Sequence, residues 1–187
     1  AQVMLFANGD VHQRRRRPVA RTFAFKLMEA MRPVTIAIAS ELINERLGKG
    51  PVDFLNEIAA QIPARIIADV LGIPRSDLPV FMKWIGDTSA SIGFVDLERR
   101  AEIEKSLTEF NAYVDGLLAD RRANPKQDFL TDYCNATAAS GDLTEGEIRA
   151  QVVGLILAGS DTTRNSLCMT LHQLLRHPDQ WAALCAD

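Results

Sequence analysis

Residues 155–164 read Leu-Ile-Leu-Ala-Gly-Ser-Asp-Thr-Thr-Arg, and this stretch is the most informative part of the sequence. The apolar residues around it favour a buried helix, yet Asp and Thr compete with the helix backbone for hydrogen bonds. A polar cluster buried in this way must be satisfied or functional. Gly159 removes a side chain, which would let a large flat ligand approach the backbone. A hydroxyl can also bond into the turn and widen the helix locally, as happens where helices carry function.

The helix that contains this stretch is predicted to be unusually long. Thr144 and Glu147 have the Thr-x-x-Glu spacing of a capping box, which satisfies backbone donors at a helix start. The helical pattern then continues to about Arg176, with two glycines in its middle. Pro178 follows, and it predicts the start of a final helix over residues 179–186.

Helical spacing of apolar residues also dominates the rest of the chain, so the predicted fold class is mainly α. An N-cap at Asp10 predicts a short arginine-rich helix that Pro18 ends or bends near Arg17. Ser76 is expected to cap a further helix, and residues 52–54 are expected to form a short extended piece. The predicted helices cover residues 11–20, 33–47, 54–71 with an interruption at Pro63, 76–92, 98–122 and 129–137.

The composition indicates a soluble globular chain, because 47% of the 187 residues are apolar and 24% are charged. The length suffices for one ordinary domain or for part of a larger one. A formal net charge of −3 gives no general case for nucleic acid or membrane as a partner. The longest apolar stretch, residues 152–158, is too short to span a bilayer, and the start carries no signal-peptide pattern. A cytoplasmic protein is therefore expected.

The three cysteines are widely spaced and form no Cys-x-x-Cys pair, so neither a zinc site nor a redox couple is indicated. A reducing compartment is the simplest interpretation. Cys134, Cys168 and Cys185 are interpreted as small apolar residues, and none of them as a metal ligand.

Residues 158–163, Ala-Gly-Ser-Asp-Thr-Thr, resemble the (Ala/Gly)-Gly-x-(Asp/Glu)-Thr-Thr motif of bacterial cytochromes P-450, which are haem-thiolate monooxygenases. In that family the motif lies on a long central helix that crosses the distal face of haem b. The resemblance implies that Ala158 and Gly159 bind this cofactor and line the oxygen-binding groove. It also implies catalytic roles for Asp161, which relays protons inward, and for Thr162, which orders the proton-donating water beside dioxygen.

Further stretches resemble the same family in the same order along the chain. Residues 143–148, Leu-Thr-Glu-Gly-Glu-Ile, resemble the start of the central helix. Residues 174–180, Leu-Leu-Arg-His-Pro-Asp-Gln, resemble the start of the next one. Residues 62–74 resemble the family's Pro-x-x-Ile-x-x-x-Leu-Gly-(Val/Ile)-Pro run. The resemblance therefore extends over almost the entire chain.

Residues 9–17, Gly-Asp-Val-His-Gln-Arg-Arg-Arg-Arg, followed by Phe23, resemble the family's His-x-x-x-Arg helix and its trailing aromatic residue. His12 and Arg16 are four residues apart and share one helical face. In the family this pair binds a haem propionate. The other arginines of the Arg14–Arg17 run would form a basic face on which a ferredoxin-type electron donor docks.

Other features of the family are missing from the 187 residues. They contain neither the Phe-x-x-Gly-x-x-x-Cys-x-Gly loop that carries the axial cysteine nor the Glu-x-x-Arg helix, and most of the β-sheet is absent. Residues 1–187 are therefore predicted to be one partial domain, truncated at both ends, without a metal ligand of its own. Without an axial thiolate the iron lacks the electron push that favours O–O cleavage, so the fragment alone is expected to be inactive.

The resemblance implies that the parent protein activates dioxygen and hydroxylates a small apolar organic substrate. Electrons would come from NAD(P)H through redox partners, and the complete protein is expected to be a monomer with no nucleic-acid or membrane partner. Substrate contacts are expected around residues 81–94, which carry several large apolar side chains.

Two alternatives remain open. A helical nucleic-acid-binding or regulatory protein would use the Arg14–Arg17 run and would show salt-sensitive affinity for DNA or RNA. The acidic total charge and the lack of aromatic residues among the arginines argue against it. A plain helical interaction module would make Asp161, Thr162 and Thr163 only a satisfied kink.

Overall fold

The computed structural model describes residues 2–22, 25–92 and 97–186, and within these ranges it contains helices and no strand. Phe23 and Phe94, which the sequence singled out, lie outside the described residues. The α-helices of the described ranges are α1 (Gly9–Thr22), α2 (Phe25–Asn44), α3 (Gln61–Leu71), α4 (Leu78–Ala90), α5 (Arg100–Ala123), α6 (Phe129–Ser140), α7 (Glu145–Arg176) and α8 (Pro178–Ala186). Three short helical turns accompany them, η1 (Met4–Phe6), η2 (Leu55–Ala59) and η3 (Arg75–Asp77). The predicted mainly α fold is confirmed for these ranges.

The long helix α7 organises the molecule, and it begins and ends as the sequence predicted. The Thr144 side chain accepts a hydrogen bond from Glu147 N at 3.3 Å, and the Glu147 side chain accepts one from Thr144 N at 3.1 Å. This capping box is the predicted one. The helix ends at Arg176, with His177 as its C-cap.

Helix α7, which the structure describes in full, is a regular α-helix and shows no local widening. The hydroxyl of Ser160 donates to the Ile156 carbonyl at 2.7 Å, and the hydroxyl of Thr162 donates to the Ala158 carbonyl at 2.6 Å. Both bonds reach back four residues within an undisturbed turn. A π-helical turn occurs instead in η2, over Leu55–Ala59.

Three helix boundaries were wrong at prolines. Helix α1 starts at Gly9 and continues through Pro18 to Thr22, so Asp10 lies inside its first turn and is not the N-cap. Pro18 is buried, and α1 packs on α6, so tertiary packing outweighs the local cost of about 3 kcal/mol for an interior proline. Helix α2 likewise contains Pro33 inside it. Pro63 does not interrupt α3, because it lies in the first turn, where its missing N–H has no partner to lose.

Two further boundaries differ from the expectation. Residues 52–54 form no strand, and the Asp53 side chain instead accepts a hydrogen bond from Asn56 N at 3.2 Å, which starts the turn of η2. Ser76 does not cap α4, because it lies within η3 and α4 follows at Leu78.

The core lies where α3, α4, α5 and α6 meet α7. Phe81 of α4 meets Phe110 of α5 edge to face at 6.0 Å between ring centroids, and Trp84 stacks on the same ring at 5.8 Å. Burial of each such side chain contributes roughly 1.5 to 3 kcal/mol to folding. The largest fully buried side chains are Tyr133, Phe81, Phe110, Leu71, Leu118, Leu130, Ile156, Gln151, Val114 and Val152.

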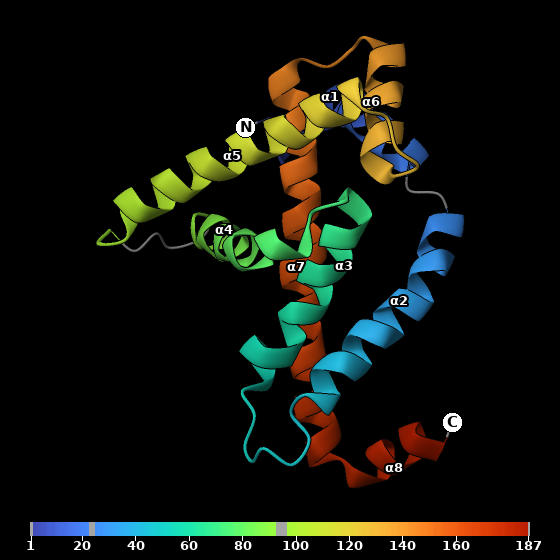
Figure 1. Ribbon diagram of the computed structural model, residues 1–187, viewed down its shortest axis with the longest axis vertical. Coiled ribbons are helices and arrows are strands. Elements are labelled where there is room, and N and C mark those ends of the chain that lie inside the picture. The colour runs from blue at the N-terminus through green and yellow to red at the C-terminus, as the bar shows by residue number, and fades with distance from the viewer. Residues whose placement is uncertain (1, 23–24, 93–96, 187) are drawn as a thin grey trace.

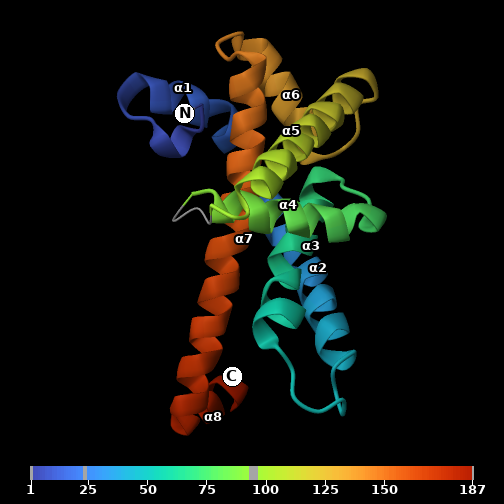
Figure 2. The same ribbon diagram turned by 90° about the vertical axis from the view of Figure 1, so that its left-hand side faces the viewer.

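The surroundings of α7 change along its length. Figures 1 and 2 show α1, α5 and α6 around its upper part, α4 across its middle and α8 at its foot. Ile148, Val152, Ile156 and Ser160 are buried in its first half. No residue of α7 after Ser160 is buried, although the structure describes this helix in full. Residues 155–164 therefore span the border between the packed half and the exposed half of α7.

Candidate functional site

Asp161 lines two pockets beside α7. The first has a volume of about 200 Å³ and lies between α7, α4, η2 and α3. The second has a volume of about 340 Å³ and is lined mostly by apolar residues of η1, α4 and α7. Ala158 also lines the second pocket. One residue, Asp161, thus borders both spaces.

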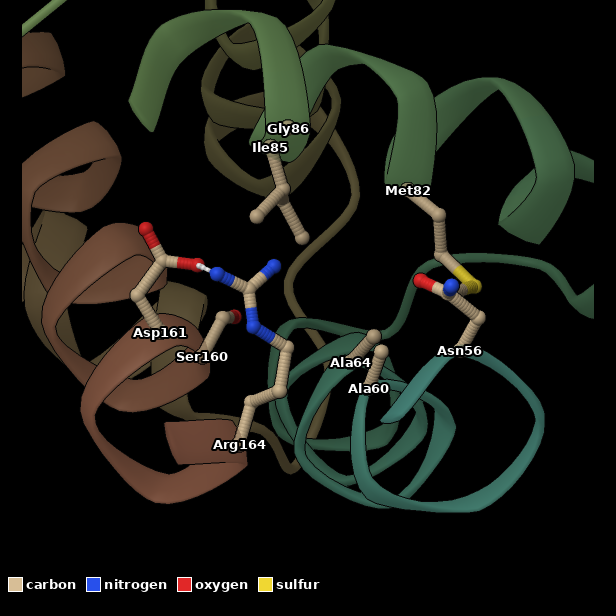
Figure 3. Close-up of a pocket in the computed structure, with 9 residues that line it drawn as sticks. All are labelled: Asn56, Ala60, Ala64, Met82, Ile85, Gly86, Ser160, Asp161 and Arg164. Atoms are coloured by element: carbon tan, nitrogen blue, oxygen red, sulfur yellow. Dashed lines mark ion pairs between the residues drawn. The ribbon is translucent and has the colours of Figure 1, made fainter. Parts of the chain in front are cut away.

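The Asp161 carboxylate is held by a neighbouring cation. Its Oδ1 lies 3.0 Å from Nη2 of Arg164, one turn further along α7. Figure 3 shows this ion pair at one side of the smaller pocket, with Asn56 and Met82 across the space. The contact has the distance of an ion pair but not the geometry of a hydrogen bond. Oδ1 is buried, and it has no hydrogen-bond partner among the described residues. It keeps its capacity to accept a proton or a hydrogen bond from a small molecule in the pocket.

Ala158 and Thr162 are one helical turn apart and are both exposed. The Thr162 hydroxyl donates its proton to the Ala158 carbonyl, so its lone pairs remain open to a donor. Ser160, between them in sequence, is buried and hydrogen-bonded to its own helix. The structure thus brings Ala158, Asp161 and Thr162 together on adjacent faces of α7.

Gly159 has a packing role that differs from the predicted reason for its small size. A Cβ built on Gly159 would lie 2.9 Å from Cδ1 of Ile67. The missing side chain therefore makes room for α3, which packs closely on α7. Since Gly159 has no side chain, only its backbone is available for contact with a flat ligand.

His12 and Arg16 lie on α1, beside the upper part of α7, and neither of them lines the two pockets at Asp161. His12 is half-buried and Arg16 is exposed. The structure does not bring this pair into contact with Asp161 or Thr162.

The first two members of the Arg14–Arg17 run are engaged in ion pairs with Glu147. Arg14 Nη2 lies 2.6 Å from Glu147 Oε1, and Arg15 Nη2 lies 2.9 Å from the same oxygen. Hydrogen bonding from Arg14 lowers the pKa of Glu147 to about 2, although burial acts in the opposite direction. Arg16 and Arg17 remain exposed on α1. Half of the arginine run therefore fastens α1 to the start of α7.

Two side-chain pairings were not predicted from the sequence, that of Asp161 with Arg164 and that of Glu147 with Arg14. The spacing of Asp161 and Arg164 permits an ion pair on a helix, so Arg164 was recognisable from the sequence. No local pattern announces the pairing of Glu147 with Arg14, because 133 residues separate the two.

The cysteines behave as small interior or surface residues. Cys134 is buried, and burial raises the pKa of its thiol, which disfavours the thiolate that a metal needs. Cys168 is half-buried and Cys185 is exposed. Within residues 2–22, 25–92 and 97–186, no cluster of three or more His, Cys, Asp or Glu side chains could hold a metal ion. None of the helices described is both long and apolar enough to cross a membrane.

Fold and site together define a helical domain whose long central helix carries an acid next to an alcohol, with two pockets beside it. The family model for Cytochrome P450 matches residues 1–186. The plant-inducible Cytochrome P450-pinF1 of Rhizobium radiobacter is 36% identical over 97% of this chain, and the match covers 43% of that relative. The chain therefore belongs to the cytochrome P450 family.

Solved structures agree with this assignment. The ligand-free structure of Cytochrome P450 TbtJ1 superposes with a TM-score of 0.89 and 28% identity, over 99% of this chain and 49% of that one. The cytochrome P450 enzyme CxnD, described as acting in C–S bond formation in chuangxinmycin biosynthesis, gives a TM-score of 0.86 and 32% identity, over 98% of this chain and 44% of that one. The chain spans less than half the length of the curated relatives it matches. None of these comparisons favours the nucleic-acid-binding alternative.

Proposed function

We propose that this chain is a partial domain, truncated at both ends, of a longer haem-dependent monooxygenase that hydroxylates a small apolar substrate. The observation that carries the proposal is the position of Asp161, which lines both pockets and directly precedes Thr162. The 187 residues alone are proposed to be inactive, since none of their cysteines is suited to be the axial thiolate.

The residues present are compatible with haem b as the cofactor. The exposed turn of Ala158 and Thr162 offers a flat ligand a small side chain and no bulky one. In the proposal, Ala158 and the backbone of Gly159 lie against the macrocycle. His12 and Arg16, one turn apart on α1, bind a propionate through charge-assisted hydrogen bonds. Haem, when bound, supplies the iron at which dioxygen is reduced.

Asp161 and Thr162 are proposed to deliver protons. Hydroxylation consumes one dioxygen, two electrons and two protons, and it leaves one oxygen atom in the substrate and the other in water. The free lone pairs of Asp161 Oδ1 can accept a proton on the side of the smaller pocket. Since Asp161 also lines the larger pocket, we propose that the proton is released there to a water held by Thr162 Oγ1. Ion pairing with Arg164 keeps the carboxyl in this position.

The larger pocket supports an apolar substrate. Leu5 and Phe6 of η1 and Leu157 of α7 supply its apolar surface. Thr88 and Ile92 also line it, and both fall within the region of residues 81–94 where substrate contacts were expected. The Thr88 hydroxyl donates to the Trp84 carbonyl at 2.6 Å, so it presents lone pairs rather than a free donor to the substrate.

Electrons are proposed to come from NAD(P)H through a ferredoxin-type donor. Arg17, which follows the proposed propionate ligand Arg16, is exposed on α1, and a cation at this surface suits an acidic docking partner. We propose further that the complete protein is cytoplasmic and monomeric.

The test uses the complete protein loaded with haem. Asp161→Asn should lower the rate of product formation on the order of 10- to 100-fold, because the amide cannot carry the proton. Thr162→Ala should divert electrons from product to hydrogen peroxide. Thr163→Ala is the matched control, since Thr163 is the exposed next residue of the same helix.

Equal peroxide yields for Thr162→Ala, Thr163→Ala and the unaltered protein would contradict the catalytic role of Thr162. A change in thermal stability without a change in product yield would favour the interpretation of Asp161 and Thr162 as a satisfied structural cluster.

A further inference from the structure

One face of α7 holds the N-terminal segment of the chain along a line of four residues. Glu147, Gln151, Gly154 and Ala158 follow one another at spacings of four, three and four, so they share one side of the helix. Glu147 binds Arg14 and Arg15 of α1. The next two positions contact residues 2–4, and Ala158 borders the larger pocket.

Gln151 is fully buried, and both ends of its amide are used. Its Oε1 accepts a hydrogen bond from Met4 N at 2.8 Å, and its Nε2 donates to the Gln2 carbonyl at 2.7 Å. Nε2 also donates to the Glu147 carbonyl at 2.9 Å, within the helix. The amide thus fixes the backbone on both sides of Val3, as a strand partner would. Its loss would remove this partner from the Met4 N–H and from the Gln2 carbonyl, both of which are partly buried.

Two glycines allow the segment to lie this close to the helix. A Cβ on Gly154 would be 2.6 Å from Val3 Cγ1, a distance that real Cβ atoms do not tolerate. A Cβ on Gly146 would be 2.8 Å from the Gln2 side chain. The hydrogen bonds of Gln151 and the steric room at these glycines therefore act at the same place.

The segment leads directly into the wall of the larger pocket. Leu5 and Phe6 of η1 line that pocket, yet they are 74% and 60% exposed. Such exposed side chains gain little from their own packing, so their position depends on how the preceding backbone is held. Met4, whose N–H binds Gln151, is the first residue of η1.

We infer that Gln151 is a positioning residue for the pocket wall: by holding Gln2 and Met4 it places Leu5 and Phe6, and so determines which shapes of apolar ligand are admitted. The inference rests on the proposed function only in taking this pocket as the site of the substrate.

The first readout is amide hydrogen exchange in the complete, haem-loaded protein, followed in a peptide that covers residues 2–6. Gln151→Met preserves length and helix propensity but removes all three hydrogen bonds. Exchange in this peptide should become faster by about tenfold, the effect of losing buried hydrogen bonds on local opening. Gln173→Met, at an exposed position of the same helix, is the matched control and should leave it unchanged.

The second readout is ligand selectivity, measured by calorimetry with two probes, linear myristic acid and rigid testosterone. The ratio of their dissociation constants should shift at least about fivefold in Gln151→Met and stay constant in Gln173→Met. In a Phe6→Ala background the same Gln151 exchange should shift the ratio far less, because the side chain through which Gln151 acts is gone.

Faster exchange with an unchanged ratio would show that Gln151 only stabilises the segment, and it would overturn the inference. Should Gln151→Met fail to fold, Gly154→Ala replaces it, since alanine favours the helix while its methyl group displaces Val3. Its ratio should shift too, and an unchanged ratio would again overturn the inference. Failure of the protein to take up haem would refute the proposed function. Calorimetry needs no haem signal, so the ratio of the two dissociation constants would still test the role of Gln151.

Discussion

The two halves of α7 are continuous in backbone and opposite in surroundings. In residues 145–160, the polar side chains Glu147, Gln151 and Ser160 are buried and hydrogen-bonded. In residues 161–176 none is buried, and large apolar side chains such as Met169 and Leu175 are 58% and 68% exposed. One helix thus combines a half that other elements of this chain hold in place with a half that they leave open.

This difference explains where the candidate site lies. In the first half the buried polar side chains are hydrogen-bonded within the fold, so they are not available for chemistry. At the border, Asp161 Oδ1 is ion-paired with Arg164 but has no hydrogen-bond partner among the described residues, and the lone pairs of Thr162 are open. Both residues lie on a helix whose first half packs against other elements. A functional group needs this combination of firm support and free bonding capacity.

The largest expected effect comes from truncating one apolar side chain in each half. Ile156→Ala should lower the free energy of unfolding by about 3 kcal/mol, because Ile156 is fully buried and leaves a cavity. Met169→Ala should change it by less than about 0.5 kcal/mol, because Met169 is mostly exposed. Urea unfolding of the 187-residue chain measures both. Equal losses at the two positions would show that the second half is packed as well, and the contrast would fail.

A smaller effect is expected at the start of α7, where Glu147 binds Arg14 and Arg15. Glu147→Gln should lower the free energy of unfolding by about 2 kcal/mol at neutral pH, since its charge-assisted hydrogen bonds from Arg14 and Arg15 and the capping box weaken together. Gln173→Glu, in the exposed half, is the matched charge control and should have almost no effect.

The same carboxylate predicts the direction of the pH dependence. Its pKa is lowered from 4.5 to about 2 in the folded protein, so its contribution to stability is fully present above pH 4.5. That contribution declines as the pH falls from 4.5 to 2 and is absent below. Glu147→Gln should therefore flatten the acid side of the stability curve, as followed by urea midpoints between pH 2 and 6. A curve with unchanged slope would mean that Glu147 is not held as the ionised form.

Gly159, next to the border, should give a still smaller change. Gly159→Ala gains about 1 kcal/mol of helix propensity but forces a methyl group against Ile67, so we expect a net loss of about 1 kcal/mol. Ile67→Val removes the Cδ1 atom that the methyl group would strike. In that background Gly159→Ala should become neutral or stabilising. A loss of the same size in both backgrounds would place the steric conflict elsewhere.

The features that were predictable from the sequence depend on local interactions. The capping box of Thr144 and Glu147 and the end of α7 at Arg176 follow from contacts within four residues, and both were correct. Pro18 and Pro33 were misjudged because packing of α1 and α2 on other elements overrides the local preference of proline to end a helix.

The candidate site likewise contains residues that a local pattern reveals and contacts that only the tertiary structure reveals. Asp161 and Thr162 stood out because polar residues interrupt an apolar helical pattern, and this contrast is visible in any single sequence. The tertiary partners of Glu147 and Gln151 were not predictable in this way, since Arg14 and Met4 are 133 and 147 residues away. Gly159 was noticed, but its neighbour Ile67 could only be found from the crossing of α3 with α7.

The smallest effect is expected from the ion pair of Asp161 with Arg164. Its size shows whether Asp161 belongs to the buried or to the exposed half of α7. Arg164 and Asp161 side chains are 31% and 26% exposed, so solvent screens their attraction. A double-mutant cycle of Arg164→Ala and Asp161→Asn should therefore give a coupling energy of about 0.5 kcal/mol, which is typical of helix pairs three residues apart. Raising the salt concentration from 0.05 to 0.5 M, roughly a threefold shorter screening length, should reduce it further. A coupling well above 1.5 kcal/mol that resists salt would indicate desolvation, so Asp161 would belong energetically to the buried half and its carboxylate would be less free to exchange protons.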